Sequence, residues 1–221
     1  MTTHHHTLKL LLVAAAASLG LAVSATAQSA NVAVPNPGAA PAGQGLLGSA
    51  YVGFAGNYAD LNGGPPSVAR GFAFYYNQPL ATGLDLTVDY NWMRAKAFGL
   101  KATEQRTDAI LTGFVKQDWG KPFVSAGVDW DWVHTDFASS DNSFGLLVGT
   151  GVEFQVAPAF AVTPFVNFVR QTGYNQNEFD YGVKATYRLN HDWSVTAKAQ
   201  YDDIRRTPNQ MEYSLGVNYH F

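Results

Sequence analysis

Apolar and polar side chains alternate along most of the chain between residues 48 and 221. Residues 84–92 show this most clearly, because five apolar side chains, from Leu84 to Trp92, are separated by four polar ones, from Asp85 to Asn91. Successive side chains of a β-strand point to opposite faces of its sheet. A period of two therefore predicts strands with one apolar and one polar face.

Ten such segments predict ten strands. Two are weaker, because Ile110 and Phe114 in one and Phe165 in the other fall on the polar side. These two strands could be out of phase by one residue or carry a β-bulge. An eight-stranded alternative would discard two well-patterned segments, so we predict ten. The segments are 48–58, 70–79, 83–95, 105–118, 121–135, 143–156, 160–172, 178–189, 193–204 and 211–221.

The connections between these segments alternate in predicted length. Short turns fall at 79–83, 118–120, 157–159 and 190–192, and longer polar links at 59–69, 96–104, 134–142, 173–177 and 203–210. Membrane barrels have tight turns on the periplasmic side and longer loops outside. The chain is therefore predicted to be all-β, a closed antiparallel up-and-down transmembrane β-barrel.

The composition fits a barrel that meets lipid outside and a polar lumen inside. Aromatic residues make up 14% of the chain, yet mean hydropathy is −0.09. After residue 27 no apolar run is long enough for a membrane-spanning helix, which argues against a helical membrane protein. The 14 Lys and Arg residues against 17 Asp and Glu show no basic patch, so no nucleic-acid partner is expected. Cysteine is absent, so the fold needs no disulfide.

The N-terminal residues 1–27 have the features of a secretory signal peptide. Lys9 precedes an apolar run from Leu10 to Val23, and Ala25-Thr26-Ala27 offers a small-residue cleavage site. Residues 28–47 are rich in Pro, Ala and Gly and predict a flexible periplasmic lead segment. The barrel then occupies residues 48–221.

The last nine residues carry a specific resemblance. Ser214, Gly216, Tyr219 and a final Phe221 resemble the C-terminal assembly signal of bacterial outer-membrane β-barrels. Over residues 48–221 the chain is similar to small barrels of the OmpA-like, OmpX-like and OmpW-like kind. The resemblance implies location in the bacterial outer membrane, among its lipids and lipopolysaccharide. It also implies periplasmic chaperones and the barrel-assembly machinery as partners during biogenesis.

The tryptophans fit this topology, because none falls in the middle of a predicted strand. Indole rings prefer the membrane–water interface. Trp119 and Trp193 lie at short turns, and the other three lie near the outer strand ends. We predict an aromatic girdle made of Trp92, Trp119, Trp130, Trp132, Trp193, Tyr219 and Phe221.

The polar faces of the strands mix Gly, Ser, Thr, Asn and scattered charges. The alternative architecture, a secreted sandwich or soluble barrel, would expose more Lys and Glu there. Charges facing a lumen indicate either a pore with ion preference or a salt-bridged plug, and the plug is favoured because ten strands enclose little space. The lumen-lining candidates are Asp85, Asp89, Asp129, Asp131, Glu153, Asp180, Lys184, Arg188, Lys198 and Asp202, with Lys116 facing them.

Two enzyme classes are weaker alternatives. Asp129 and Asp131 with His134 suggest the acidic and His–Asp pairs of omptin proteases, which are ten-stranded barrels. The other acidic pair, Asp202-Asp203, has no histidine beside it, and the predicted strands are barely long enough to cross the membrane. A lipid-modifying enzyme would need a Ser–His–acid grouping, and none can be assigned. We predict no catalytic residue.

No cofactor or metal is predicted either. The acidic segment 136–141 lacks the alternating ligands of a calcium loop. Arg205-Arg206 could contact lipopolysaccharide phosphates. The sequence therefore predicts a non-enzymatic outer-membrane β-barrel with a structural or surface-contact role and a largely side-chain-filled polar lumen. The alternative is a narrow porin-like channel for ions or small solutes.

Overall fold

The computed structural model describes residues 45–61, 68–97, 100–136, 138–204 and 209–221. The predicted signal peptide, residues 28–44 and Arg205-Arg206 lie outside the described residues. In the part of the chain that is described, no helix is long and apolar enough to cross a membrane.

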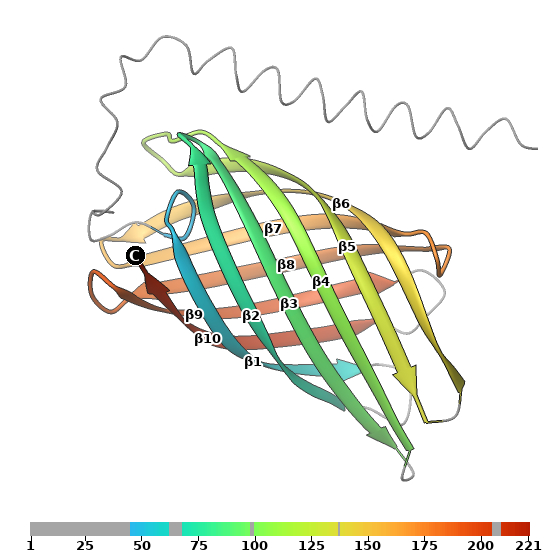
Figure 1. Ribbon diagram of the computed structural model, residues 1–221. Coiled ribbons are helices and arrows are strands. Elements are labelled where there is room, and N and C mark those ends of the chain that lie inside the picture. The colour runs from blue at the N-terminus through green and yellow to red at the C-terminus, as the bar shows by residue number, and fades with distance from the viewer. Residues whose placement is uncertain (1–44, 62–67, 98–99, 137, 205–208) are drawn as a thin grey trace, which may run out of the picture. The chain divides into compact units, whose positions relative to one another are not determined.

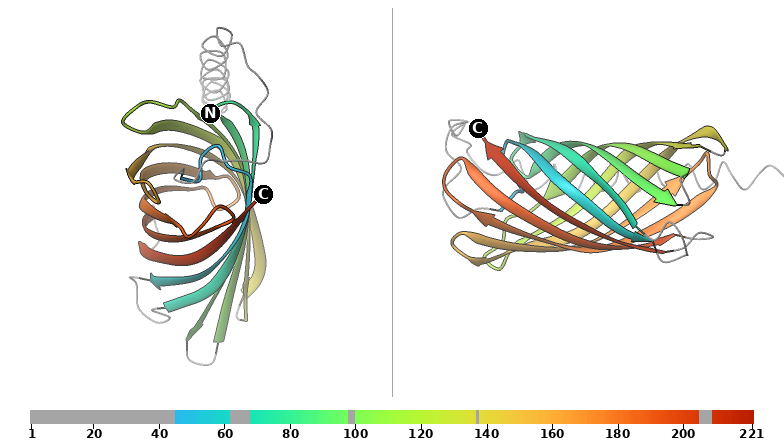
Figure 2. Two further views of the ribbon diagram at one scale, coloured as in Figure 1. Left: turned by 90° about the vertical axis from the view of Figure 1, so that its left-hand side faces the viewer. Right: turned by 90° about the horizontal axis from the view of Figure 1, so that it is seen from below.

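Ten antiparallel strands form one closed sheet, which confirms the predicted fold class and strand number (Figure 1). β1 and β10 close it in continuous register, from Tyr51 opposite His220 to Leu61 opposite Gln210. Figure 2 shows the strands running obliquely around the barrel, as closure requires. The strands are β1 (Tyr51–Leu61), β2 (Val68–Ala81), β3 (Leu84–Ala97), β4 (Leu100–Phe114), β5 (Lys121–Thr135), β6 (Ala138–Ala157), β7 (Phe160–Gln171), β8 (Gln176–Arg188), β9 (Trp193–Ile204) and β10 (Gln210–His220).

Both weakly patterned segments keep the predicted phase. Ile110 of β4 and Phe165 of β7 line the lumen, and β4 pairs with both of its neighbours without a register shift. Register shifts occur instead near the ends of β2, β5 and β6. The apolar residues on the polar faces are therefore lumen residues, not signs of a bulge.

The predicted alternation of short turns and long loops is wrong. β3 and β4 are separated by only two residues, as are β5 and β6, whereas residues 115–120 separate β4 from β5. Beyond the apolar belt the exterior face can carry polar residues, so a strand continues where its hydrophobic pattern stops. Lys116, predicted to face the lumen, lies exposed in the β4–β5 connection because β4 ends at Phe114.

The exterior of the barrel is apolar and the interior polar. Exposed large side chains such as Phe74, Val148 and Leu215 alternate with buried polar ones along the strands. This arrangement is the reverse of a soluble fold and suits an outer face in lipid. Small side chains line the lumen on β1, β2 and β3, which leaves room for the longer charged side chains of the other strands: Ala55, Ala59, Ala69, Ala73 and Ala95 are all buried.

The predicted girdle residues lie at two levels. One end of the barrel holds the C-terminus and the β2–β3, β4–β5, β6–β7 and β8–β9 connections, and is called the turn end below. Trp119 and Trp193 are exposed there, and the Trp193 ring lies 5.1 Å from that of Tyr219. Phe221, also exposed, stacks on Tyr76 at this end. Towards the other end, Trp92 and Trp132 are both opposite Gln105 and so lie in one row of paired residues, and Trp130 stacks on Trp132.

Candidate functional site: the barrel lumen

Strand alternation brings the ten lumen-lining candidates together inside the barrel. Asp89, Lys184 and Lys198 line the central cavity. The other seven are buried: Asp85, Asp129, Asp131, Glu153, Asp180, Arg188 and Asp202. A charge out of water needs a partner or a hydrogen bond, so the pairing of these groups decides what the lumen can do.

Arg106 is the centre of an ion-pair network in the outer half of the lumen, on the side away from the turns. Its Nε atom lies 2.7 Å from Asp129 Oδ2 and 3.4 Å from Asp108 Oδ1, and its Nη1 atom lies 3.4 Å from Glu178 Oε1. Gln171 Nε2 donates to the second oxygen of Asp129 at 2.5 Å. One guanidinium thus joins carboxylates from three strands across the interior.

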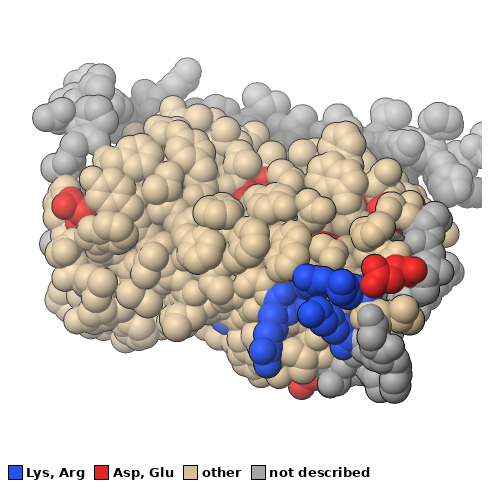
Figure 3. All heavy atoms as spheres, turned by 60° about the horizontal axis from the view of Figure 1, so that its bottom comes forward, with Lys and Arg blue, Asp and Glu red and all other residues tan. Residues whose placement is uncertain are grey.

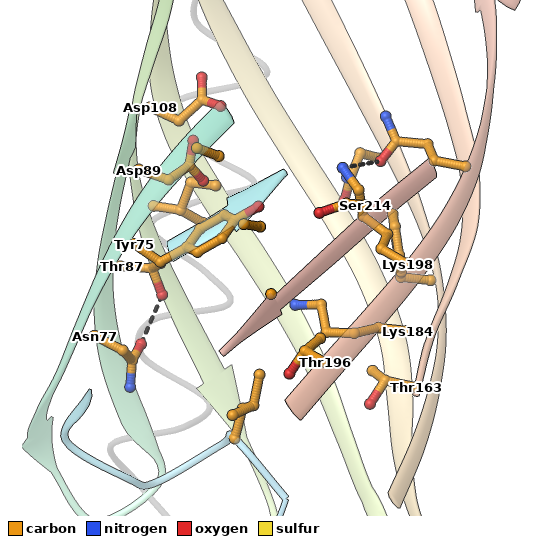
Figure 4. A pocket seen from close by; sticks show the side chains of 18 of the residues that line it. Tyr75, Asn77, Thr87, Asp89, Asp108, Thr163, Lys184, Thr196, Lys198 and Ser214 are labelled. Atoms are coloured by element: carbon orange, nitrogen blue, oxygen red, sulfur yellow. Dashed lines mark hydrogen bonds between the residues drawn. The ribbon is translucent and has the colours of Figure 1, made fainter. Parts of the chain in front are cut away.

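A second network crosses β9 and β10. Lys198 Nζ lies 2.8 Å from Glu212 Oε1 and donates to Gln200 at 3.2 Å, and Gln200 Nε2 donates to Asp202 at 2.6 Å. Lys184 stands directly opposite Lys198 on β8. Figure 4 shows both lysines extending into the cavity from the wall opposite Tyr75, Asp89 and Asp108.

Residues 45–49, which precede β1, lie across the mouth of the lumen at the turn end. The backbone N–H groups of Leu46 and Leu47 donate to Glu153 Oε2 at 2.7 and 3.2 Å, and that of Gly48 donates to Asp85 Oδ2 at 2.7 Å. Lys121 Nζ donates to the Leu47 carbonyl and pairs with Glu153 at 2.9 Å. The last residues of the predicted lead segment are therefore bound inside the barrel.

The space left between these networks is small. It is a cavity of about 260 Å³, lined at the turn end by Leu46, Leu47 and Tyr51 and farther along by charged side chains. Since a water molecule takes about 30 Å³ of liquid, the cavity has room for a short cluster of waters.

The site contains residues that the sequence reasoning missed, among them Arg106, Asp108, Glu178 and Glu212. Arg106 and Asp108 share the phase of Ile110 on β4. They were overlooked because that segment is the weakly patterned one. The alternation that puts Ile110 on the polar face of β4 also puts Arg106 and Asp108 there, and so predicts that both face the lumen.

Three buried carboxylates are close enough to share a cation. Single oxygen atoms of Glu178, Asp180 and Asp202 lie within 4.8 Å of one another. Two of the three already have donors, because Arg106 pairs with Glu178 and the amides of Gln200 and Gln210 donate to Asp202. Side chains of the lumen wall thus already stabilise part of the negative charge of this cluster.

The groups that suggested a protease are separated by the sheet. Asp129 and Asp131 point into the lumen, whereas His134 is exposed on the outside and its Nδ1 atom lies 2.7 Å from Ser140 Oγ. His134 therefore forms no His–Asp pair with Asp129 or Asp131. Near Asp131, in the β7–β8 connection, burial raises the pKa of the Tyr174 hydroxyl, and the charges of Asp131 and Asp141 raise it further.

His220 of β10 has a hydrogen-bond partner in Ser194 of β9. Its Nε2 atom lies 2.9 Å from Ser194 Oγ, and Asn218 donates to the same oxygen. The Nδ1 atom of His220 has no hydrogen-bond partner, and both residues are buried. Ser194 and His220 thus form a buried hydrogen bond between β9 and β10, and none of the side-chain hydrogen bonds described for them involves a carboxylate.

The closed sheet, the apolar exterior and the polar lumen define a β-barrel of the bacterial outer-membrane type. No protein-family model matches the chain, and no curated protein matches it. Among solved structures, the chain is similar to the NanC porin, with 10% identity over 77% of this chain and 100% of that one and a TM-score of 0.51. This likeness shows the fold alone.

Two further structures match with TM-scores below 0.5. One is Neisserial surface protein A, with 18% identity over 77% of this chain and 96% of that one and a TM-score of 0.42. The other is an outer membrane channel from Pseudomonas putida F1, with 12% identity over 86% of this chain and 100% of that one and a TM-score of 0.48.

Proposed function

We propose that the chain is a non-enzymatic protein of the bacterial outer membrane, with a structural or surface-contact role and a lumen closed to solutes. The observation that carries this proposal is the binding of residues 45–49 across the mouth of the lumen by Asp85, Lys121 and Glu153. Hydrogen bonds to charged groups contribute about 1.5–3 kcal/mol each. Several of them together hold the segment in place.

The second candidate is a narrow channel for ions or small solutes. The cavity and the two unlike networks that line it favour this alternative, because Lys184 and Lys198 face carboxylates across a space that has room for water. Opening such a path would require residues 45–49 to leave the mouth. The two candidates therefore differ in the state of that segment.

Single-channel conductance of the folded protein in a planar bilayer tests the closed lumen. We expect the native chain to be silent and the double variant Asp85→Asn/Glu153→Gln to give current steps, because the anchoring carboxylates are lost. The double variant Asp136→Asn/Asp203→Asn removes two exposed carboxylates and serves as the matched control. Stable steps in the native chain would support the channel. A silent Asp85→Asn/Glu153→Gln variant would mean that the binding of residues 45–49 is not what closes the lumen.

The route to the membrane is part of the proposal. The signal peptide would be cut after Ala27, and Ser214, Gly216, Tyr219 and Phe221 would be read by the barrel-assembly machinery after delivery by periplasmic chaperones. Ser214 is buried, whereas Tyr219 and Phe221 are exposed on the outer face, where a binding partner can reach them. A mature N-terminus other than Gln28 would contradict the cleavage site.

A further inference from the structure

Four cations gather on the exterior of β2, β3 and β4, near the β3–β4 connection. Arg70, Lys96 and Lys101 are exposed, and Arg94 is half-buried. The register places Arg70 opposite Arg94 and Lys96 opposite Lys101. Figure 3 shows Lys and Arg side chains gathered in one area of a mostly uncharged face, with acidic side chains directly beside them and at a few scattered points. These four residues are called the basic patch below.

The fold itself does not neutralise the basic patch. Like charges directly opposite each other on one face of a sheet are destabilising, and the patch contains two such pairs. In the described ranges none of the four side chains takes part in an ion pair. Exposed carboxylates on the same or neighbouring segments are Asp60, at the end of β1, Glu104 on β4, and Asp136, which accepts a bond from the Lys101 backbone N–H.

The basic patch lies directly beyond an aromatic cluster. On β2, Phe72 lies two residues from Arg70, on the side away from the β3–β4 connection. Trp92 lies in the same position relative to Arg94 on β3. The Phe72 and Trp92 rings stack 5.4 Å apart, and Phe72 also contacts Phe54, Phe74 and Tyr90. Aromatic rings mark the boundary between hydrocarbon and headgroups. In an outer membrane with the chain termini on the periplasmic side, this order would place the cations at the headgroup level of the outer leaflet.

The exterior beside the basic patch is also hollowed. An open groove of about 430 Å³ is lined by Tyr90, Gln105, Trp132 and His134, and also by one carboxylate, that of Asp141. A ligand with anionic groups beside an apolar body would find cations, aromatic rings and a groove on adjacent strands. A charged lipid has these properties.

We propose that the basic patch binds the phosphate groups of lipopolysaccharide in the outer leaflet. Arginine matches phosphate oxygens through two parallel N–H bonds, and lysine supplies a point charge. The acyl chains would then run over the aromatic cluster. The proposal rests on the outer-membrane location proposed above, but not on whether the lumen conducts.

Affinity of the full folded protein for purified lipopolysaccharide in detergent tests the proposal. We expect Arg94→Gln/Lys96→Gln to bind roughly 30-fold more weakly at low salt, at about fivefold per cation near a membrane surface. The control Lys116→Gln/Arg170→Gln removes two cations away from the basic patch and should bind like the native chain. Arg94→Lys/Lys96→Arg keeps the charges and should retain most of the affinity. Heat-modifiable gel migration verifies that each variant is folded.

Three further results would overturn the proposal. The first is equal affinity for dephosphorylated lipopolysaccharide, which would remove the phosphates from the interaction. The second is equal affinity for phosphatidylglycerol, which would make the patch a general anionic-lipid surface. The third is the same loss of affinity in the control double variant. None of these outcomes affects the conductance experiment, so the two proposals fail separately.

Discussion

At the residue scale, the face on which a side chain lies decides its energetic role. Val148 and Val156 are both on the outer face of β6, but Val148 lies in the apolar belt and Val156 at the turn end. The cost of a charge on the lipid face depends on its depth. Replacing each of these two valines by arginine therefore compares the cost of the same charge at two depths in the membrane.

We expect Val148→Arg to destabilise the folded barrel by about 2–4 kcal/mol and Val156→Arg by about 0–1 kcal/mol. Reversible unfolding in urea with the barrel in lipid vesicles measures both. Equal costs at the two positions would contradict the assigned membrane belt.

Arg106 is the residue on which the buried carboxylates of the outer lumen depend. Removing one partner of a buried ion pair costs about 3–5 kcal/mol, because the other charge stays uncompensated. We expect Arg106→Gln to cost about that much in the same unfolding experiment, with a smaller loss for Arg106→Lys. Arg170, which is outside the lumen and bonds to Asn175 and Asn177, is the control. A negligible loss in Arg106→Gln would mean that the carboxylates are neutral without it.

At the element scale, the sequence predicted strands better than connections. The alternation of Leu84 to Trp92 determines both the existence and the facing of β3, because burial on one face enforces a strict period. That constraint ends outside the apolar belt, so Lys96 and Lys101 gave no strand signal although both lie in strands. The basic patch was missed for a related reason, since its members come from three strands.

Residues 45–47 could not be placed from the sequence, because a segment without periodicity has no face to assign. Residues 48 and 49, predicted to begin the first strand, belong to the same bound segment, since β1 begins at Tyr51. Gly48 is essential to its path: the backbone φ is +82°, a conformation that favours glycine, and a Cβ there would lie 3.1 Å from the Phe114 ring.

We expect Gly48→Val to release residues 45–49 while leaving the strands paired. Amide hydrogen exchange of Leu46 and Leu47 should then become fast, whereas exchange in β5 stays slow. Gly56→Ala is the control, because a Cβ at Gly56 meets no atom within 4 Å. Unchanged protection at Leu46 in Gly48→Val would contradict the bound state of the segment.

At the scale of the whole molecule, the closed sheet creates both the lumen and the lipid-facing exterior, so both proposals depend on closure. Closure leaves no exposed strand edge and satisfies the backbone groups within the bilayer. It is specific in register, since Asn57 of β1 lies opposite Ser214 of β10, whereas Asn218 is opposite Gly53.

A disulfide test of this register is the most direct measurement, because the native chain has no cysteine. In the membrane-inserted protein, Asn57→Cys/Ser214→Cys should cross-link on oxidation, giving a reducible shift on a denaturing gel. Asn57→Cys/Asn218→Cys, on the same strands and face but about 13 Å out of register, should not. Cross-linking of the second pair, or of neither, would contradict a barrel closed by β1 and β10.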